Sequence, residues 1–425
     1  MSASPASTPP TVPAQPTSPL APDDPRVLRA RRLLIGLYGL LGITVASWLS
    51  RLPSVREALD LSTGQLGVIL LTGAVGSLAT VLVAGAIVVR WGSVKVLLAA
   101  AVLFACGNTL LAVGPAVGLV PVLVAGIIVL SMSFALGNVP MNVESAVIER
   151  HMRRTVVPQF HAAFSIGSVV GSGLGAAAAW AEVPLLVQFG AVSVGSLVWR
   201  FLTVPGAVLP TTAPVAVTQD EGTPRRRGAG FRASLGAWRE RRTLLVGVIV
   251  MAAALSEGSA NNWLAISVVD GFAQREAVAA LVFGAFVASM TVSRVIGPRL
   301  IDRLGPVRVL ATSAVVSVAG LVLFGTAPTL SLAVVGVVGW GLGAGLAVPI
   351  GMVAVSEDPM QAAGRVAVVS AFASMASLAA PPALGLAAEA LGARQALLLV
   401  AIPLVVAALL SGQVRPQRPG AAEQG

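Results

Sequence analysis

Long apolar runs, separated by short polar or proline-containing segments, dominate the pattern of this chain of 425 residues. A helix that crosses a bilayer needs about 20 mostly apolar residues. Twelve runs approach or exceed this length, which predicts twelve membrane-spanning helices. The predicted spans are 33–52, 64–88, 96–113, 118–145, 157–180 and 184–208 in the first half, then 244–268, 277–300, 307–326, 329–354, 364–388 and 393–412.

The polar segments divide this all-α membrane protein into two six-helix bundles with a linker and two tails. The first residues are rich in Pro, Ser, Thr and Ala, lack the features of a signal peptide and predict a disordered tail. The middle segment contains Arg225-Arg226-Arg227 and predicts a basic cytoplasmic linker. The expected parts are the tail 1–25, the first bundle 26–208, the linker 209–243, the second bundle 244–412 and the tail 413–425.

Composition supports a membrane location. The chain is 56% hydrophobic and 11% charged, with a mean hydropathy of +0.87, whereas soluble domains carry about 25% charged residues. A soluble protein this apolar could not cover its surface, so ordinary soluble enzymes are excluded. The single cysteine, Cys106, lies in an apolar run and provides no disulfide framework.

The 28 Lys and Arg residues fix an expected topology. Between the predicted spans, 22 of them fall on one side of the membrane and 4 on the other, while Arg200 and Arg294 lie within spans. The positive-inside rule therefore predicts that both termini are cytoplasmic. This distribution explains the net charge of +10 without nucleic acid as a partner. Abundant Ala, Gly and Val with one lysine is typical of a GC-rich bacterial genome, which suggests a bacterial inner membrane.

One short motif occurs twice, 213 residues apart. The copies read Arg90-Trp91-Gly92-Ser93-Val94-Lys95 and Arg303-Leu304-Gly305-Pro306-Val307-Arg308, each in a basic loop between two apolar runs. A repeat at half the chain length predicts two homologous halves. Many transporters are built this way, with the substrate site between the halves.

The twelve spans, the basic central linker and this repeated loop resemble the major facilitator superfamily. The superfamily loop pattern places an acid before the Arg-x-Gly-x-x-Arg/Lys core, and Val89 stands where the first copy would have that acid. The resemblance therefore makes the second copy the better candidate for a charge-paired gate. The residues matched to this gating motif are Arg90, Gly92 and Lys95 in the first copy and Asp302, Arg303, Gly305 and Arg308 in the second.

Further segments resemble the MosC/YbjJ-like branch of that superfamily. They are 48–53, 61–67, 138–144, 160–167 and 257–263, with Asn262 in place of the acid usual in the last segment. The resemblance implies a small polar solute, inositol- or sugar-like, as the substrate, and it leaves the direction of transport open.

Glu257 is the leading candidate for chemistry, because it lies about 13 residues into the seventh predicted span. A carboxylate at that depth must be protonated, paired or in contact with water. It could couple proton movement to transport or bind the substrate, and the alternative is a structural carboxyl bonded to a neighbouring helix. Asn261, Asn262 and Trp263 follow and suit recognition of a polar solute. Their alternative roles are interhelical hydrogen bonding and, for Trp263, interfacial anchoring.

Polar residues of the fourth and fifth spans are the next candidates. Asn138 and Asn142 are four residues apart, so they share a helix face and could line a cavity. Glu144 and Glu149 lie near Arg150, Arg153 and Arg154, which indicates either an inner-gate ion-pair network or a solvated helix end. His161 is a candidate proton relay, although a helix-packing hydrogen bond is preferred.

Two further features have a preferred structural interpretation. Gly167, Gly171 and Gly175 with Ser172 resemble the superfamily's antiporter motif, but close helix packing is preferred. Arg294 could pair with an acid, but extension of its side chain to lipid headgroups is preferred.

The sequence therefore predicts a monomeric secondary transporter in the bilayer, with protons as the expected coupling ion. With two histidines, one cysteine and no clustered ligands, neither a metal nor another cofactor is expected. No nucleotide-binding motif is present, so ATP drive is not expected. A drug or metabolite efflux antiporter, or a non-transporting membrane sensor or scaffold, remains an alternative. A membrane-embedded enzyme is the least favoured, because no nucleophile and base cluster at one depth.

Overall fold

The computed structural model describes residues 24–209, 236–357 and 361–416. Throughout these residues the regular elements are helices. The predicted tail at 1–25, apart from Asp24 and Pro25, lies outside the described residues. So do the Arg225-Arg226-Arg227 part of the linker and the end of the 413–425 tail.

Among the described residues, twelve helices are long and apolar enough to cross a membrane, as many as the sequence predicts. Those of the first half are α1 (Pro25–Leu49), α3 (Thr63–Trp91), α4 (Ser93–Val117), α5 (Val120–Met152), α6 (Val157–Trp180) and α7 (Leu185–Ala207). Those of the second half are α9 (Arg241–Phe272), α10 (Glu276–Leu304), α11 (Pro306–Thr326), α12 with α13 (Leu330–Ala344, Ala347–Val355), α14 (Ala362–Leu391) and α15 to η2 (Ala393–Leu397, η1 Leu398–Val400, α16 Ala401–Leu409, η2 Leu410–Val414).

The first span differs most from its predicted bounds. Its helix begins at Pro25, where the Asp24 side chain accepts a hydrogen bond from the Arg26 backbone N–H. The arginines of its first turns lower the local hydropathy without preventing helix formation, so hydropathy alone placed the start too late. The helix ends at Leu49, and a separate short helix, α2 (Leu52–Ala58), follows with Pro53 in its first turn.

Both copies of the repeated motif make the same tight turn between two helices. Gly92 joins α3 to α4 with a φ of 79°, and Gly305 joins α10 to α11 with a φ of 80°. A side chain is strained at such positive φ values, whereas glycine adopts them at little cost. Glycine in this motif therefore has a structural reason that is independent of gating.

Large apolar side chains cover the outside of the bundle. Leu82, Trp180 and Leu202 are each more than 75% exposed, and Leu409 is 80% exposed. Apolar surface of this extent fits lipid rather than water.

Small residues hold the first half together. A Cβ atom added to Gly167 or Gly171 on α6 would collide with the backbone of Gly39 or Ile43 on α1. The glycines therefore allow two helix backbones to approach closely, which is the preferred packing interpretation of this motif.

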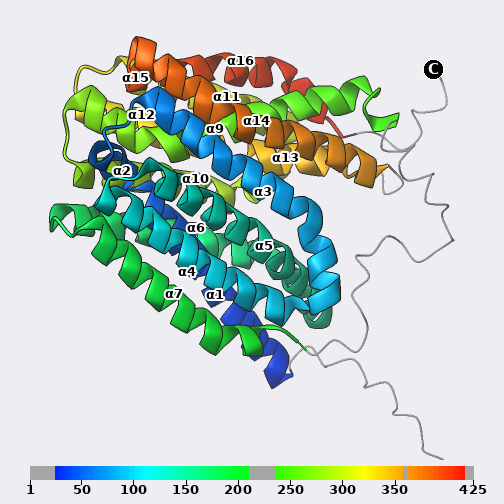
Figure 1. The fold of residues 1–425 in the computed structure, drawn as a ribbon. Helices are drawn as coiled ribbons and strands as arrows, with labels where there is room; N and C mark the ends of the chain where they lie inside the picture. Colours follow the sequence, from blue (N-terminus) through cyan, green and yellow to red (C-terminus); the bar gives the residue numbers. More distant parts are fainter. Residues whose placement is uncertain (1–23, 210–235, 358–360, 417–425) are drawn as a thin grey trace, which may run out of the picture.

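The two halves meet along two equivalent seams. One joins α6 to α10, where Ser172 faces Gly284, and the other joins α3 to α14, where Gly67 lies against Pro381. Figure 1 shows α1 to α7 and α9 to α16 as two groups lying side by side, with α3 and α14 adjacent. The space between the groups is where a substrate site is expected.

Candidate functional site

A cavity of about 220 Å³, here called the central cavity, lies between the halves. Its wall is mainly apolar, and α1, α3, α5, α9 and α14 contribute to it. The polar side chains of the wall are Ser131, Asn262 and Ser377. The lining residues are Val45, Trp48, Leu49, Leu70, Ala74, Ile127, Leu130, Ser131, Phe134, Asn262, Ser377 and Pro381.

Glu257 is paired with Arg294 of α10. The Glu257 Oε2 and Arg294 Nη2 atoms are 3.1 Å apart, and the two side chains are 29% and 31% exposed. Arg294 also donates from Nε to the Gly345 carbonyl at 3.3 Å. The expected extension of Arg294 to lipid headgroups is therefore wrong, because Glu257 supplies a counter-ion within the bundle.

The residues after Glu257 separate into two environments. Asn261 and Asn262 are half-buried, and Asn262 lines the central cavity. A Cβ atom added to Gly258, one turn before Asn262, would meet no atom within 4 Å, so this face of α9 borders open space. Trp263 is 1% exposed and packs in the core near Gly385. The structure thus places Trp263 neither on the cavity wall nor at a membrane interface.

Three polar side chains of the first half form a hydrogen-bonded chain. The Tyr38 hydroxyl lies 3.1 Å from Asn142 Oδ1, and Asn142 Nδ2 donates to both the backbone oxygen and Oδ1 of Asn138 at 3.0 Å. Asn138 and Asn142 are exposed although they lie within α5. The sequence placed the two amides correctly on one face, but it gave no reason to include Tyr38.

His161 lies between the two halves. Its ring is exposed, makes an edge contact with Tyr38 at a centroid distance of 5.7 Å, and is close enough to interact electrostatically with Arg294. Within the described parts of the chain the ring makes no hydrogen bond. The preferred helix-packing hydrogen bond is therefore absent, and a relay role stays a prediction.

The end of the bundle that carries α2 and the turn between α9 and α10 is here called the gate end. Arg51 Nε lies 2.9 Å from Glu276 Oε2, across the two halves, and Glu276 also accepts from the Ser54 backbone N–H at 2.9 Å. Arg51 further donates to Gln188 Oε1 at 2.7 Å. Burial lowers the pKa of the Arg51 guanidinium, and the neighbouring Glu276 carboxylate opposes that effect.

A second ion pair joins the halves nearby. Arg56 Nη1 and Asp270 Oδ2 are 2.6 Å apart, and this pair is more exposed than the Arg51 pair. Within the described residues, all hydrogen bonds and ion pairs between the halves lie at the gate end. The molecule is therefore latched at that end.

The opposite end carries the basic loops and is here called the basic end. The charged residues of the repeated motif are exposed there, and none forms an ion pair with a described residue. The expected charge-paired gate at Asp302 is thus not formed in this conformation. The exposed motif residues are Arg90, Lys95, Asp302, Arg303 and Arg308.

Glu144 and Glu149 do not form the expected inner-gate network. Glu144 is 3% exposed and hydrogen-bonds the Ser93 side chain and the Leu209 backbone. Glu149 Oε2 accepts from the backbone N–H groups of Val156 and Val157 at 2.7 and 2.9 Å. Glu149 therefore caps the first turn of α6. This role corresponds to neither of the two expectations, the ion-pair network and the solvated helix end.

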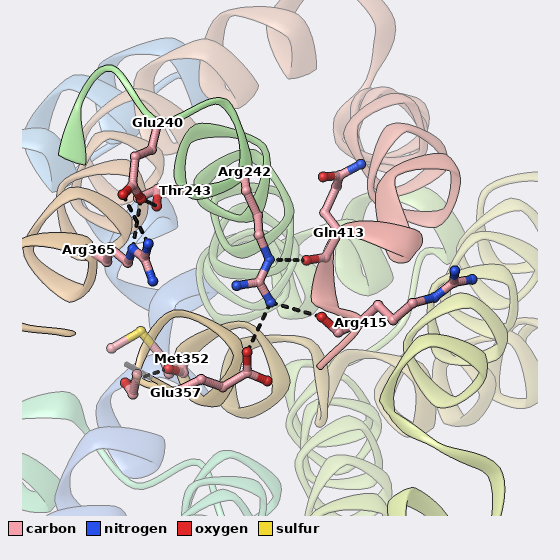
Figure 2. A network of polar contacts seen from close by, with 9 residues as sticks. Glu240, Arg242, Thr243, Met352, Glu357, Arg365, Gln413 and Arg415 are labelled. Carbon is pink, nitrogen blue, oxygen red and sulfur yellow. Dashed lines mark hydrogen bonds and ion pairs between the residues drawn. The ribbon is translucent and has the colours of Figure 1, made fainter. Parts of the chain in front are cut away.

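Apart from the exposed Arg26–Asp24 pair at the start of α1, the ion pairs of the described basic end lie within the second half (Figure 2). Glu240, just before α9, pairs with Arg365 of α14 at 2.7 Å and accepts from the Thr243 hydroxyl at 2.6 Å. Arg242 pairs with Glu357 at 3.3 Å and donates to the Gln413 carbonyl at 3.0 Å. This network ties the start of α9 to three other segments. The hydrogen bond that Arg365 donates to Glu240 is the main reason that the pKa of the Glu240 carboxyl is lowered.

Two further observations concern ligands. Arg200 of α7 points into the first half, beside Asn138, and the sequence interpretation gave it no role. A charged residue inside an apolar run was the available signal.

Among the described residues, no group of three or more His, Cys, Asp or Glu side chains could hold a metal ion.

Comparison with known proteins agrees with this architecture. The chain is 29% identical to the uncharacterized transporter y4wD of Sinorhizobium fredii, over 87% of this chain and 94% of the relative. It is 24% identical to the membrane protein MosC of Rhizobium meliloti, over 86% of each chain.

Solved structures share the fold. A structure of the nucleoside transporter NupG superposes with a TM-score of 0.72 at 14% identity, covering 91% of this chain and all of that one. The E. coli fucose:proton symporter FucP superposes with a TM-score of 0.62 at 15% identity, covering 91% of this chain and 98% of that one. The family model described as Major Facilitator Superfamily matches residues 33–359 and 246–424. This chain therefore belongs to the major facilitator superfamily of transporters.

Proposed function

We propose that this protein is a proton-coupled secondary transporter of a small polar organic solute, which it moves by alternating access. The observation that carries the proposal is the Glu257–Arg294 pair, at 3.1 Å, next in sequence to Gly258, which borders open space. Ionisable residues inside a membrane are costly and mark ion or substrate pathways. This pair lies within two spans and on the same helix as Asn262 of the cavity wall.

The contacts between the halves support alternating access. The described conformation is latched at the gate end by the Arg51–Glu276 and Arg56–Asp270 pairs. By the positive-inside rule the basic end faces the cytoplasm of a bacterial inner membrane. The latch therefore closes the outward path, and rocking of the halves would break it and expose the cavity to the opposite side.

Glu257 and Arg294 can exchange partners during such a cycle. When Glu257 accepts a proton, its attraction to the Arg294 guanidinium weakens, and Arg294 becomes available to a solute or to His161. When the proton leaves, the ion pair forms again. Proton binding and solute binding would then be linked through one arginine, and one chain contains all the groups that this requires.

Two solved structures with this fold carry related activities in their names. NupG is a nucleoside transporter and FucP is a fucose:proton symporter. Both names describe small polar solutes, which is the class proposed for this chain.

Proton movement in proteoliposomes tests the proposal. Wild type and Glu257→Gln would be reconstituted with an internal pH dye, and inositols, sugars, amino sugars and drugs would be added one at a time. We expect at least one polar solute to change the internal pH with wild type but not with Glu257→Gln. Solute uptake without proton movement in either protein would reject proton coupling.

A second candidate is export of an apolar metabolite or drug in exchange for protons. The apolar wall of the central cavity favours it, because Trp48, Leu130 and Phe134 would pack against a hydrophobic solute. The same screen separates the two candidates by two results. One is the class of solute that drives proton movement, and the other is whether the internal pH rises or falls.

A further inference from the structure

A second, smaller space lies beside the central cavity, and most of the side chains that line it are apolar. Residues of α1, α4, α5 and α7 line it, among them Ser133, Asn138 and Arg200, and it is here called the Arg200 pocket. Phe134 of α5 lines both spaces, so they are neighbours along that helix. The Arg200 pocket has a volume of only about 20 Å³, so it has room for no more than a small end group of a solute.

Arg200 is held inside the bundle rather than at its surface. Its guanidinium carbon lies 4.7 Å from the centre of the Phe104 ring, and Phe104 is only 1% exposed. Stacking on an aromatic face attracts a guanidinium but supplies no negative charge. The side chain therefore does not extend to a membrane surface, where water or lipid phosphates could neutralise it.

No carboxylate of the described residues forms an ion pair with Arg200, and no described residue hydrogen-bonds its guanidinium. Arg294, which also lies within a span, has Glu257 as its partner. In the first half, Glu144 is occupied by Ser93 and the Leu209 backbone. Arg200 is thus a cation within the membrane that lacks a protein counter-ion, and such a residue marks a binding site.

The hydrogen bonds of α5 present a second donor at the same place. Asn142 Nδ2 faces the backbone oxygen of Asn138, which can only accept, so this atom must be the amide nitrogen. Because Asn142 donates, the Asn138 atom that it meets at 3.0 Å must be Oδ1. The Asn138 NH₂ group therefore remains free to donate. The Arg200 pocket offers guanidinium and amide donors, a set that matches an anion.

We propose that the Arg200 pocket binds a carboxylate group of the transported solute, so that the substrate is a small hydroxylated organic acid. This inference rests on the proposed transport function and specifies its substrate class. One guanidinium balances the single charge of a carboxylate, whereas a phosphate monoester carries about −1.5 to −2 charges and would leave an excess in the membrane. The apolar wall of the central cavity would receive the carbon skeleton.

Binding of matched acid and neutral sugars to the purified full-length protein tests this inference. The pairs are galacturonate with galactose and gluconate with glucose, and calorimetry gives the dissociation constants. We expect the acid of at least one pair to bind about 10- to 100-fold more tightly than its neutral partner, the range typical of a charge-assisted hydrogen bond. Arg200→Gln should remove this preference. Arg299→Gln, which removes an exposed arginine of α10, should retain it.

Two further variants keep the test decisive if Arg200→Gln does not fold. Arg200→Lys keeps the charge but loses the planar fork, so it should bind the acid with intermediate affinity. Asn138→Ala changes an exposed side chain and should weaken the acid more than the neutral sugar.

Three results would overturn the inference. The first is equal binding of the acid and neutral members of each pair. The second is an acid preference that survives in Arg200→Gln. The third is binding of chloride or inorganic phosphate at the Arg200 pocket that none of the organic acids displaces. The outcome is separate from that of the transport proposal. Proton-coupled flux of neutral solutes alone would reject only the carboxylate site, whereas acid binding without proton movement would reject only proton coupling.

Discussion

The two halves of the molecule hold the charged residues of their spans in different ways. In the second half, Glu257 and Arg294 neutralise each other at 3.1 Å. In the first half, Asn138 and Asn142 offer amide groups, and Arg200 has no counter-ion among the described residues. The difference suggests a division of labour, in which the second half exchanges protons and the first half recognises the solute. Coupling would then depend on how the halves move against each other.

The largest expected effect comes from breaking the charge pair of the second half. Glu257→Gln and Arg294→Gln should each reduce solute-driven proton movement about 10- to 100-fold, because each removes a charged hydrogen bond. The double variant should be little worse than either single variant, since both residues act through one pair. Proton flux in proteoliposomes measures all three. Additive losses would show that the two residues act separately.

The latch between the halves gives the next effect. Arg51→Ala should destabilise the described conformation by about 3–5 kcal/mol, because the Arg51 and Glu276 side chains are only 6% and 14% exposed and Glu276 would be left without its cation. Arg56→Ala is the matched control at the more exposed ion pair, and it should lower the stability of this conformation by only about 0–1 kcal/mol. Thermal unfolding in detergent compares the variants. Equal shifts would mean that burial does not control the strength of the latch.

Packing within the first half gives a smaller effect. Gly171→Ala should cost about 1–3 kcal/mol, because the added methyl group would collide with the Ile43 backbone. Gly173→Ala on the same helix meets no atom within 4 Å and should be neutral or stabilising by up to about 1 kcal/mol. Unfolding temperatures give the comparison. A tolerated Gly171→Ala would contradict close contact between α1 and α6.

The smallest effect concerns the basic end of the second half, shown in Figure 2. Arg365 lowers the pKa of Glu240, so their pair stabilises the protein above the unfolded carboxyl pKa of about 4.3 and loses that contribution as the pH falls through the folded pKa. Arg365→Gln should therefore be less stable by under about 1 kcal/mol at neutral pH, since Glu240 is one-third exposed. The difference should vanish at low pH. Thermal unfolding between pH 3 and 7 measures it, and a constant difference would exclude the ion pair as its cause.

The fold was predictable from the sequence because membrane spans depend on a one-dimensional property. Apolar length gave the twelve helices, and the repeated motif gave the two halves, with its glycines at the turns between helices. Hydropathy failed to predict the start of a helix whose first turns are basic, because α1 begins at Pro25 and not at residue 33.

The candidate site was predictable only in part, because partners depend on packing. The depth of Glu257 and the spacing of Asn138 and Asn142 indicated residues of interest. Their partners, Arg294 and Tyr38, come from other helices and could not be found by spacing. Trp263 shows the reverse error, because its proximity to the two asparagines in sequence does not place it on their face of α9.

Access to the cavity from each side of the membrane tests the account most directly. Gly258 borders open space beside Glu257, and Cys106 is the single cysteine, so Gly258→Cys in a Cys106→Ser background provides one reporter thiol. Impermeant thiol reagents would be applied from either side, with and without a transported solute. Alternating access predicts that the thiol reacts from the cytoplasmic side at rest and gains reactivity from the outer side when solute or Arg51→Ala releases the latch. Reactivity from one side only, under every condition, would contradict it.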